Sequence, residues 1–235
     1  AAALAGASAA GCASTPAAST PEASRPPAPA PDGASAPEPT PEPTPEPTRT
    51  FAFRFPSVID TASDTRASLP ALKASGVSTI FRYYATAAQP EVPQKQLTEA
   101  ERDAILGAGL NLAVVFQYFN NVRENLTPER GKADGAVCLD RAARFAQPRG
   151  SAVYFGVDGD WPDRMSEIGG YFREAGGPLR AAGYRIGVYG SGATCARMLD
   201  EGLADLAWLA YAPAWSGAAA FYNSRRWTLF QAGLD

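Results

Sequence analysis

Hydrophobic positions beyond residue 56 follow two alternating spacings along the chain. Short apolar runs rich in β-branched and aromatic residues, typical of strands, cover residues 56–60, 78–85, 111–119, 151–158, 184–190, 206–215 and 227–233. Stretches with helical spacing separate the first six of these runs, at 68–76, 97–109, 131–147, 166–183 and 193–202. Strands that alternate with helices in this way predict an α/β fold whose parallel sheet is covered by helices.

Strand number and turn residues narrow the architecture further. Gly76, Gly109 and Gly183 stand directly before predicted strands, where glycine commonly ends a helix. Thr98 and Glu101 have the spacing of a capping box at the start of the helix at 97–109. Seven or eight strands favour a closed, TIM-like β/α barrel over an open sheet. The last third of the chain lacks full helices between its strands, so the barrel is expected to be irregular there.

Acidic residues follow two of the predicted strands. In a β/α barrel, functional side chains gather at the carboxyl ends of the strands. Alternation along the run at 151–158 turns Val153 and Phe155 towards the helices and turns Asp158, followed by Asp160, towards the barrel mouth. Asp60 ends the first strand in the same orientation. Repulsion and partial burial would separate the proton affinities of these three carboxylates, as acid–base hydrolysis requires, and we predict that they are catalytic.

Composition divides the chain into a spacer and a folded domain. Residues 13–50 are almost wholly Ala, Pro, Ser, Thr and Glu, and 12 of the 21 prolines precede Phe51. Such a segment buries too little apolar surface to fold, so we expect a disordered linker at 13–50. Every Trp, Tyr and Phe lies in residues 51–235, which are numerous enough for one globular domain.

Charge and histidine content exclude several function classes. The first 50 residues contain five acids and two bases, which gives the whole net charge of −3, and the remainder has 19 of each sign. A neutral domain without a basic cluster lacks the electrostatic features of a nucleic-acid-binding protein, so we expect no nucleic-acid partner. The chain contains no histidine, so Ser-His-Asp catalysis and His-ligated zinc are excluded. We expect no metal and no cofactor.

The amino terminus has features of an export signal. Residues 1–12 are rich in small residues and end in "AAGC", which resembles a bacterial lipobox with Cys12 as the lipidated residue. We therefore expect an exported monomer in the cell envelope, held at the outer face of the membrane by a lipid on Cys12 or secreted. Cys138 and Cys195 lie on separate predicted helices and are expected to be buried free thiols.

Five motifs together resemble one known family. "VIDTASD", "LTEAERDAILGAGL", "YFGVDGD", "GVYGSG" and "WLAYAPAW" occur in the order seen in the glycoside-hydrolase-like family called domain of unknown function 1906. That family is similar to family 25 glycoside hydrolases, the Chalaropsis-type lysozymes. The resemblance covers residues 51–235 and implies a TIM-like barrel that acts on peptidoglycan or a related cell-wall polysaccharide.

The resemblance also implies roles for individual residues. Asp60 matches an acid at the floor of the lysozyme groove, and Asp158 and Asp160 match an Asp-x-Glu motif whose Glu is the proton donor. We therefore assign Asp160 as donor and Asp158 and Asp60 as ionised stabilising groups. The shorter Asp160 departs from the family Glu. The predicted substrate-binding residues are Arg82, Gln117, Trp161, Tyr189, Trp208, Tyr211, Trp215 and Gln231.

Two functional hypotheses follow, together with a weaker third. The first is an envelope glycosidase of the lysozyme type, with either retaining or inverting stereochemistry. The second is a non-catalytic glycan-binding module that has kept the groove and lost the best acid. A metal-dependent phosphodiesterase on a similar barrel is disfavoured by the lack of histidine.

Overall fold

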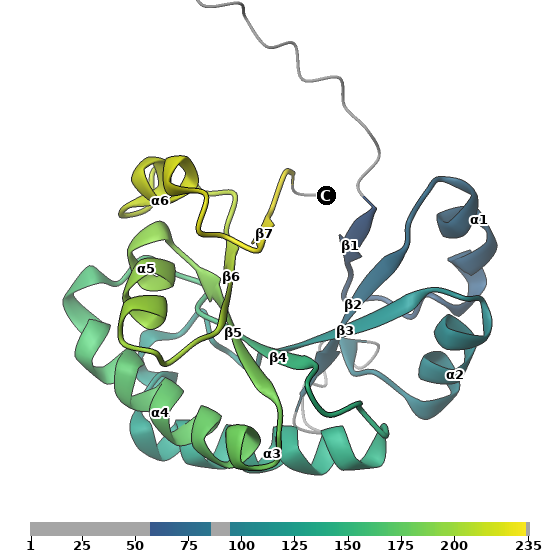
Figure 1. The fold of residues 1–235 in the computed structure, drawn as a ribbon, viewed down its shortest axis with the longest axis horizontal. Coiled ribbons are helices and arrows are strands. Elements are labelled where there is room, and N and C mark those ends of the chain that lie inside the picture. The colour runs from purple at the N-terminus through teal and green to yellow at the C-terminus, as the bar shows by residue number, and fades with distance from the viewer. Residues whose placement is uncertain (1–56, 86–94, 234–235) are drawn as a thin grey trace, which may run out of the picture. The chain divides into compact units, whose positions relative to one another are not determined.

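Seven parallel strands form a single sheet whose order in space is their order in the chain (Figure 1). The computed structural model describes residues 57–85 and 95–233, all within one compact unit. The predictions for residues 1–50, including Cys12, lie outside these ranges. The strands are β1 (Val58–Asp60), β2 (Thr79–Tyr84), β3 (Asn111–Phe116), β4 (Ala152–Gly156), β5 (Arg185–Gly190), β6 (Leu206–Leu209) and β7 (Leu229–Phe230).

Helices follow the strands and cover the outer face of the curled sheet (Figure 1). They are α1 (Leu69–Ala74), α2 (Glu99–Gly107), α3 (Pro128–Arg144), α4 (Met165–Ala181), α5 (Gly192–Asp200) and α6 (Ala218–Ser224), with 3-10 turns η1 (Arg66–Ser68), η3 (Arg123–Asn125) and η4 (Pro162–Arg164). The predicted β/α barrel architecture is confirmed. Within the described residues, however, β1 and β7 each pair on one side only, so the curl stays open. The irregular last third is confirmed by the short α6 and the two-residue β7.

Side-chain alternation separates two apolar layers. Val153 and Phe155 on β4 belong to the large cluster between the sheet and the helices. Tyr154, between them, points to the inner face, where it packs with Phe81 and Trp208. Gly187 on β5 makes room for this ring, since a Cβ there would lie 2.3 Å from Tyr154 Cδ1. The predicted orientation of the fourth strand is therefore confirmed, and the inner face is lined by aromatic residues.

The predicted glycines and the Thr98 cap at the helix ends are confirmed, and the predicted role of Glu101 is not. Gly76, Gly109 and Gly183 have φ angles of 95°, 73° and 89°, as expected for glycines that end helices. Thr98 caps α2, because its hydroxyl oxygen accepts a hydrogen bond from the Glu101 amide. The Glu101 carboxylate does not complete the predicted capping box. It instead accepts hydrogen bonds from the backbone and hydroxyl of Thr65 and from the guanidinium of Arg82 on β2.

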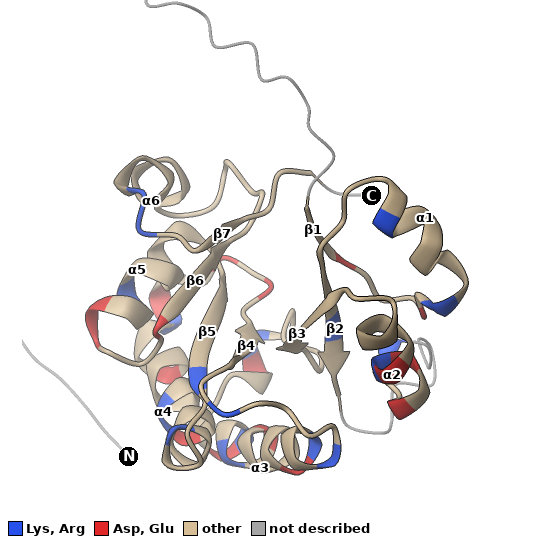
Figure 2. Ribbon diagram, turned by 45° about the vertical axis from the view of Figure 1, so that its right-hand side comes forward, with Lys and Arg blue, Asp and Glu red and all other residues tan. Residues whose placement is uncertain are grey.

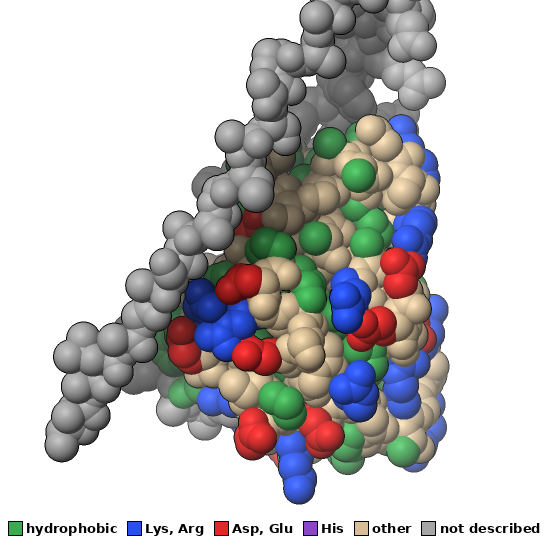
Figure 3. Space-filling view, turned by 90° about the vertical axis from the view of Figure 1, so that its left-hand side faces the viewer, with side chains coloured by type: hydrophobic (Ala, Val, Ile, Leu, Met, Phe, Trp, Pro, Cys, Tyr) green, Lys and Arg blue, Asp and Glu red, His purple; other side chains and the backbone are tan. Residues whose placement is uncertain are grey.

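Charged side chains of both signs are distributed over the outside of the domain. Figure 2 shows Lys, Arg, Asp and Glu mainly on the helices and loops, and the face in Figure 3 mixes acids and bases without separating them by sign. Cys138 and Cys195 are buried and unpaired with each other, as predicted. In the described ranges, none of the helices combines the length and apolarity that crossing a membrane requires.

Candidate functional site

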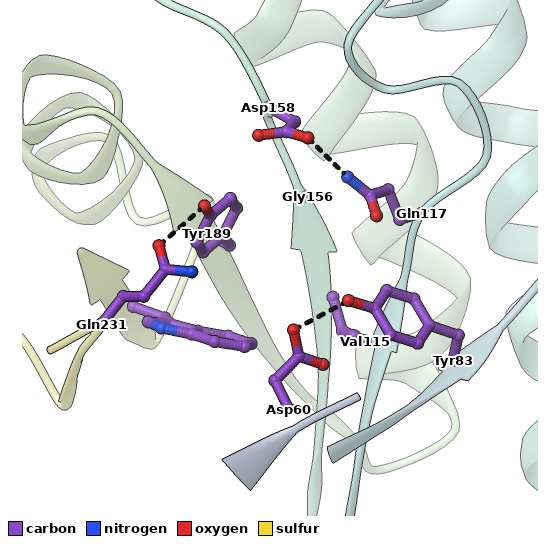
Figure 4. A pocket seen from close by; sticks show the side chains of 9 residues that line it. Asp60, Tyr83, Val115, Gln117, Gly156, Asp158, Tyr189 and Gln231 are labelled. Atoms are coloured by element: carbon purple, nitrogen blue, oxygen red, sulfur yellow. Dashed lines mark hydrogen bonds between the residues drawn. The ribbon is translucent and has the colours of Figure 1, made fainter. Parts of the chain in front are cut away.

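A pocket of about 210 Å³ lies at the carboxyl ends of the strands, and every strand contributes to it (Figure 4). β1, β2, β5 and β6 each supply one residue from within the strand. β3 and β4 supply one strand residue each and a second from the segment that follows, and β7 contributes the residue directly after it. The lining residues are Asp60, Tyr83, Val115, Gln117, Gly156, Asp158, Tyr189, Trp208 and Gln231. Residues far apart in sequence meet here because parallel strands end at the same edge of the sheet.

Two carboxylates face the pocket, Asp60 at the end of β1 and Asp158 after β4, with β2 and β3 between them. Tyr83 Oη donates a hydrogen bond of 2.8 Å to Asp60 Oδ2. Gln117 Nε2 donates one of 3.0 Å to Asp158 Oδ2. Figure 4 shows both carboxylates directed towards the space between them. Each acid is thus oriented by a neutral donor that lies on or directly after a neighbouring strand.

Lys95 supports this arrangement by contacting two of the lining residues, Gln117 and Tyr83. Its Nζ donates a hydrogen bond of 2.8 Å to Gln117 Oε1 and lies 4.5 Å from the ring centroid of Tyr83. Because Lys95 takes the Gln117 oxygen, the amide nitrogen of Gln117 is directed at Asp158. Burial lowers the pKa of the Lys95 ammonium, and the negative charges of Asp60 and Asp158 oppose this shift.

The phenols of the pocket are held neutral. Burial, followed by the charges of the two aspartates, raises the pKa of both Tyr83 and Tyr189 well above the usual value for tyrosine. Tyr189 Oη donates a hydrogen bond of 3.1 Å to Gln231 Oε1. Its ring also packs at 5.0 Å against Trp208, which is 7% exposed. These groups therefore act as hydrogen-bond donors and as an aromatic wall rather than as bases.

The structure brings together most of the residues predicted from sequence. Asp60, Gln117, Asp158, Tyr189, Trp208 and Gln231 all line the pocket. Tyr211 lies beside it; the residue is 47% exposed, and its backbone N–H donates to Gln231 Oε1 at 3.0 Å. Trp161 and Trp215 are half-buried and do not line the pocket. The Trp161 indole packs closely over Gly159 and against the outer core, in agreement with ordinary packing at the rim.

Asp160, the predicted proton donor, lies outside the pocket lining. Its Oδ2 accepts two hydrogen bonds of 2.9 Å from Ser216, one from the backbone N–H and one from the hydroxyl. Its Oδ1 is buried and accepts no hydrogen bond from any described residue. Asp160 thus ties the segment after β4 to the loop before α6, while Asp158, two residues earlier, faces the pocket.

Arg82 requires a correction, because it points away from the pocket. It occupies the outward phase of β2, is 0% exposed, and pairs with Glu101 at 2.8 Å between Arg82 Nε and Glu101 Oε1. Its Nη1 donates to the Thr61 carbonyl oxygen at 2.5 Å. The guanidinium therefore links β2 to α2 and to the segment after β1, and Arg82 does not line the pocket.

Sequence reasoning missed Tyr83 and Lys95. Tyr83 is two residues from Phe81, which also faces inwards. Both phases of β2 carry bulky residues, however, so alternation alone does not show which phase faces the barrel. Lys95 lies outside every predicted strand and helix, and no periodic pattern points to it.

Asn120 is a further missed residue, behind the pocket. Its backbone oxygen accepts a hydrogen bond of 3.1 Å from the Asp158 N–H, and its buried side chain contacts the Tyr171 hydroxyl at 3.5 Å. That hydroxyl donates to Asp134 Oδ2 at 2.9 Å. Burial raises the pKa of Asp134 despite the nearby Arg130 guanidinium. This buried polar chain anchors the segment that carries Asp158 to α3 and α4.

The part of the chain that the structure describes contains no group of three or more Asp, Glu, Cys or His side chains placed to hold a metal ion.

Comparisons with known proteins agree with this fold and assign the chain to a family. A family model described as "Rv2525c-like, glycoside hydrolase-like domain" matches residues 70–232. The crystal structure of the Tat-secreted protein Rv2525c from Mycobacterium tuberculosis, in complex with L-tartrate, superposes with a TM-score of 0.62 at 19% identity, covering 75% of this chain and 86% of that one. The glycoside-hydrolase-like resemblance expected from the motifs is confirmed.

Two uncharacterized proteins of Bacillus subtilis are also similar. FadG is 27% identical over 153 residues, which cover 63% of this chain, and YbfG is 28% identical over 191 residues, which cover 76%. In both cases the match spans 26% of the relative. The chain thus corresponds to about a quarter of the length of these two relatives.

Proposed function

This chain belongs to the Rv2525c-like, glycoside hydrolase-like domain family, and we propose that its pocket binds and hydrolyses a glycan of the bacterial cell envelope, peptidoglycan or a related polysaccharide. The observation that carries the proposal is the convergence of all seven strands on two carboxylates, two neutral phenols and an indole. Carboxylates accept hydrogen bonds from sugar hydroxyls, and aromatic rings pack against the apolar faces of sugar rings.

The size of the pocket indicates how much of a glycan it would hold. Its volume of about 210 Å³ is below the ~300–1,000 Å³ usual for sites that enclose a drug-sized ligand. We therefore propose that one sugar ring enters the pocket and that the rest of the polymer lies along the rim, near the exposed Tyr211.

Hydrolysis needs an acid near the leaving oxygen and a negative charge near the oxocarbenium-like sugar. Asp60 and Asp158 are the two carboxylates that line the pocket, and in our proposal they carry these tasks. The protonated acid gives its proton to the leaving oxygen as the glycosidic C–O bond breaks, and the water that attacks the anomeric carbon gives its proton to a carboxylate of the pair. For Asp160 to act as the donor expected from sequence, the substrate must displace Ser216 from its Oδ2.

One observation favours the second candidate, a glycan-binding module without catalysis. Neither oxygen of Asp160 is available in the pocket, because Oδ2 accepts hydrogen bonds from Ser216 and Oδ1 is buried. Asp160 also stands where the resembling lysozymes have Glu. A groove that keeps its binding groups and loses its acid would still recognise the glycan.

Cellular location belongs to the same proposal. We place the protein outside the cytoplasmic membrane as a monomer, with residues 13–50 as the spacer and Cys12 as the lipidated anchor. The "AAGC" sequence supports this, and the family member Rv2525c is described as Tat-secreted.

The test is release of dye from labelled peptidoglycan, measured together with binding to the same material in a sedimentation assay. D60N and D158N keep the size of the side chain and remove its charge. Both should lower release by at least about 100-fold, the usual minimum for removal of an acid–base group. D163N is the matched control, because Asp163 is exposed, lies outside the pocket lining and forms a salt bridge of 3.3 Å with Arg123.

D160N separates the two roles of Asp160. A loss of release equal to that of D158N would make Asp160 the proton donor, whereas release within about threefold of wild type would leave it as a link to Ser216. Binding by the wild type without any release would favour the non-catalytic module. If the wild type neither binds nor releases labelled material, glycan recognition itself is rejected.

A further inference from the structure

Lys95 is a half-buried cation that contacts two residues of the pocket lining, Gln117 and Tyr83, and forms no salt bridge with any described residue. Arg82 and Arg130, which also lie partly or fully inside the protein, contact Glu101 and Asp134 at 2.8 Å and 2.7 Å. Lys95 has no carboxylate within 4.0 Å among residues 57–85 and 95–233; its contacts there are the Gln117 oxygen and the Tyr83 ring.

The ammonium has more hydrogen-bond donors than its contacts with the described residues use. A lysine carries three N–H groups, and one of them is directed at Gln117 Oε1. The two phenols of the pocket are already engaged, because Tyr83 donates to Asp60 and Tyr189 donates to Gln231. Among these three donors, Lys95 is therefore the one best able to donate to an additional acceptor oxygen.

The surrounding charges do not fully compensate Lys95. The facing ionisable groups are Asp60 at the end of β1, Tyr83 on β2 and Asp158 after β4. The attraction of the two aspartates is weaker than the effect of burial, so the net result is a lowered pKa for Lys95. A ligand oxygen with negative charge would replace the hydration that the ammonium has lost.

We propose that Lys95 binds an acidic substituent of the sugar that enters the pocket, so that the domain selects glycans whose ring carries a carboxylate. This inference rests on the proposed glycan-binding function. The sugar hydroxyls face Asp60 and Asp158, and the carboxylate lies on the side of Tyr83 and Gln117, where Lys95 adds a charge-assisted hydrogen bond.

The test compares two sugars with the same ring. N-acetylmuramic acid carries a carboxylate on an ether side chain that N-acetylglucosamine lacks, and binding of each to the full chain is measured by NMR titration. The wild type should bind the acidic sugar at least about tenfold more tightly. K95M should remove this preference, so that the variant binds the two sugars with affinities within about twofold of each other. K95R should retain most of the preference.

K73M is the control for a lysine-to-methionine change elsewhere, because Lys73 is exposed and its Nζ donates to the Ala108 carbonyl oxygen. It should bind both sugars as the wild type does. Equal affinity of the wild type for the two sugars, or an unchanged preference in K95M, overturns the role of Lys95 while glycan binding stands. Failure of the wild type to bind either sugar rejects the proposed function, and the inference with it.

Discussion

At the scale of single residues, two carboxylates of the pocket interact with one nearby ammonium, that of Lys95. Asp60 and Asp158 are held by neutral donors, and Lys95 is linked to both through Tyr83 and Gln117. The proton affinity of Lys95 therefore reports directly on the two acids. Burial makes its charged form less favourable, and each aspartate makes it more favourable.

Removal of either acid should consequently lower the pKa of Lys95 further. In D60N or D158N the opposing attraction is reduced while burial stays the same, so deprotonation of Lys95 should occur at lower pH than in the wild type. NMR titration of ¹³C-dimethylated lysines measures this. Lys73, which is exposed and donates to the Ala108 carbonyl oxygen, provides the internal reference. A Lys95 midpoint that is unchanged in both variants would show that the acids do not act on it.

Pocket-lining residues could be predicted from sequence where the alternation of side chains along a strand shows clearly which face is apolar. Asp158 follows a strand whose outward phase is apolar, and Asp60 ends a short run of the same kind, so both were placed correctly at the pocket. β2 has large side chains in both phases, and Arg82 was therefore assigned to the ligand side in place of Tyr83. The orientation of Asp160 depends on Ser216, 56 positions away, and no local pattern records that contact.

At the scale of elements, two glycines of α3 allow its backbone to pack directly against the backbone of α4. A Cβ on Gly131 would lie 2.3 Å from the Tyr171 carbonyl oxygen, and one on Gly135 would lie 2.6 Å from that of Ala175. Since these neighbours are backbone atoms, they cannot move aside as a side chain would. The missing side chains allow α4 to bring Tyr171 against Asp134, which is part of the buried chain that anchors Asp158.

Alanine at these two positions should therefore destabilise the domain. We expect G131A and G135A each to lower the free energy of unfolding by about 1–3 kcal/mol, because overpacking outweighs the gain in helix propensity of about 1 kcal/mol. G107A in α2 is the matched control, since its Cβ would meet nothing within 4 Å, and it should be neutral or stabilising by up to about 1 kcal/mol. Urea unfolding measures all three, and equal midpoints for G131A and G107A would contradict the role of the glycine contacts.

Element order and helix ends could be read from sequence because their signals are local. Turn glycines with positive φ and the Thr98 cap act within a few residues. The other half of the capping box failed for a non-local reason, since the buried Arg82 guanidinium offers Glu101 a stronger partner than a backbone N–H. The open edge between β1 and β7 was not predicted either, because closure depends on curvature of the whole sheet.

At the scale of the whole molecule, residues from both edges of the sheet contribute to the same pocket. Asp60 on β1 and Gln231 after β7 both line it, yet within the described residues each of these strands pairs with one neighbour only. β1 has three residues and β7 has two, so few backbone hydrogen bonds hold either edge. Both edges should therefore open locally more readily than the central strands.

A glycan that contacts Asp60 and Gln231 together would join these edges, and this gives a prediction for the molecule as a whole. With a chito-oligosaccharide at about 100 times its dissociation constant, opening that releases the ligand should be suppressed about 100-fold, or about 2.7 kcal/mol. Hydrogen exchange at short labelling times should then slow most in peptides that cover β1 and β7. Peptides from α3 and α4, which are already buried against each other, should change little. Protection confined to the segments after β3 and β4 would show that the ligand binds one wall only, and the pocket would then be a half-site rather than a junction of all seven strands.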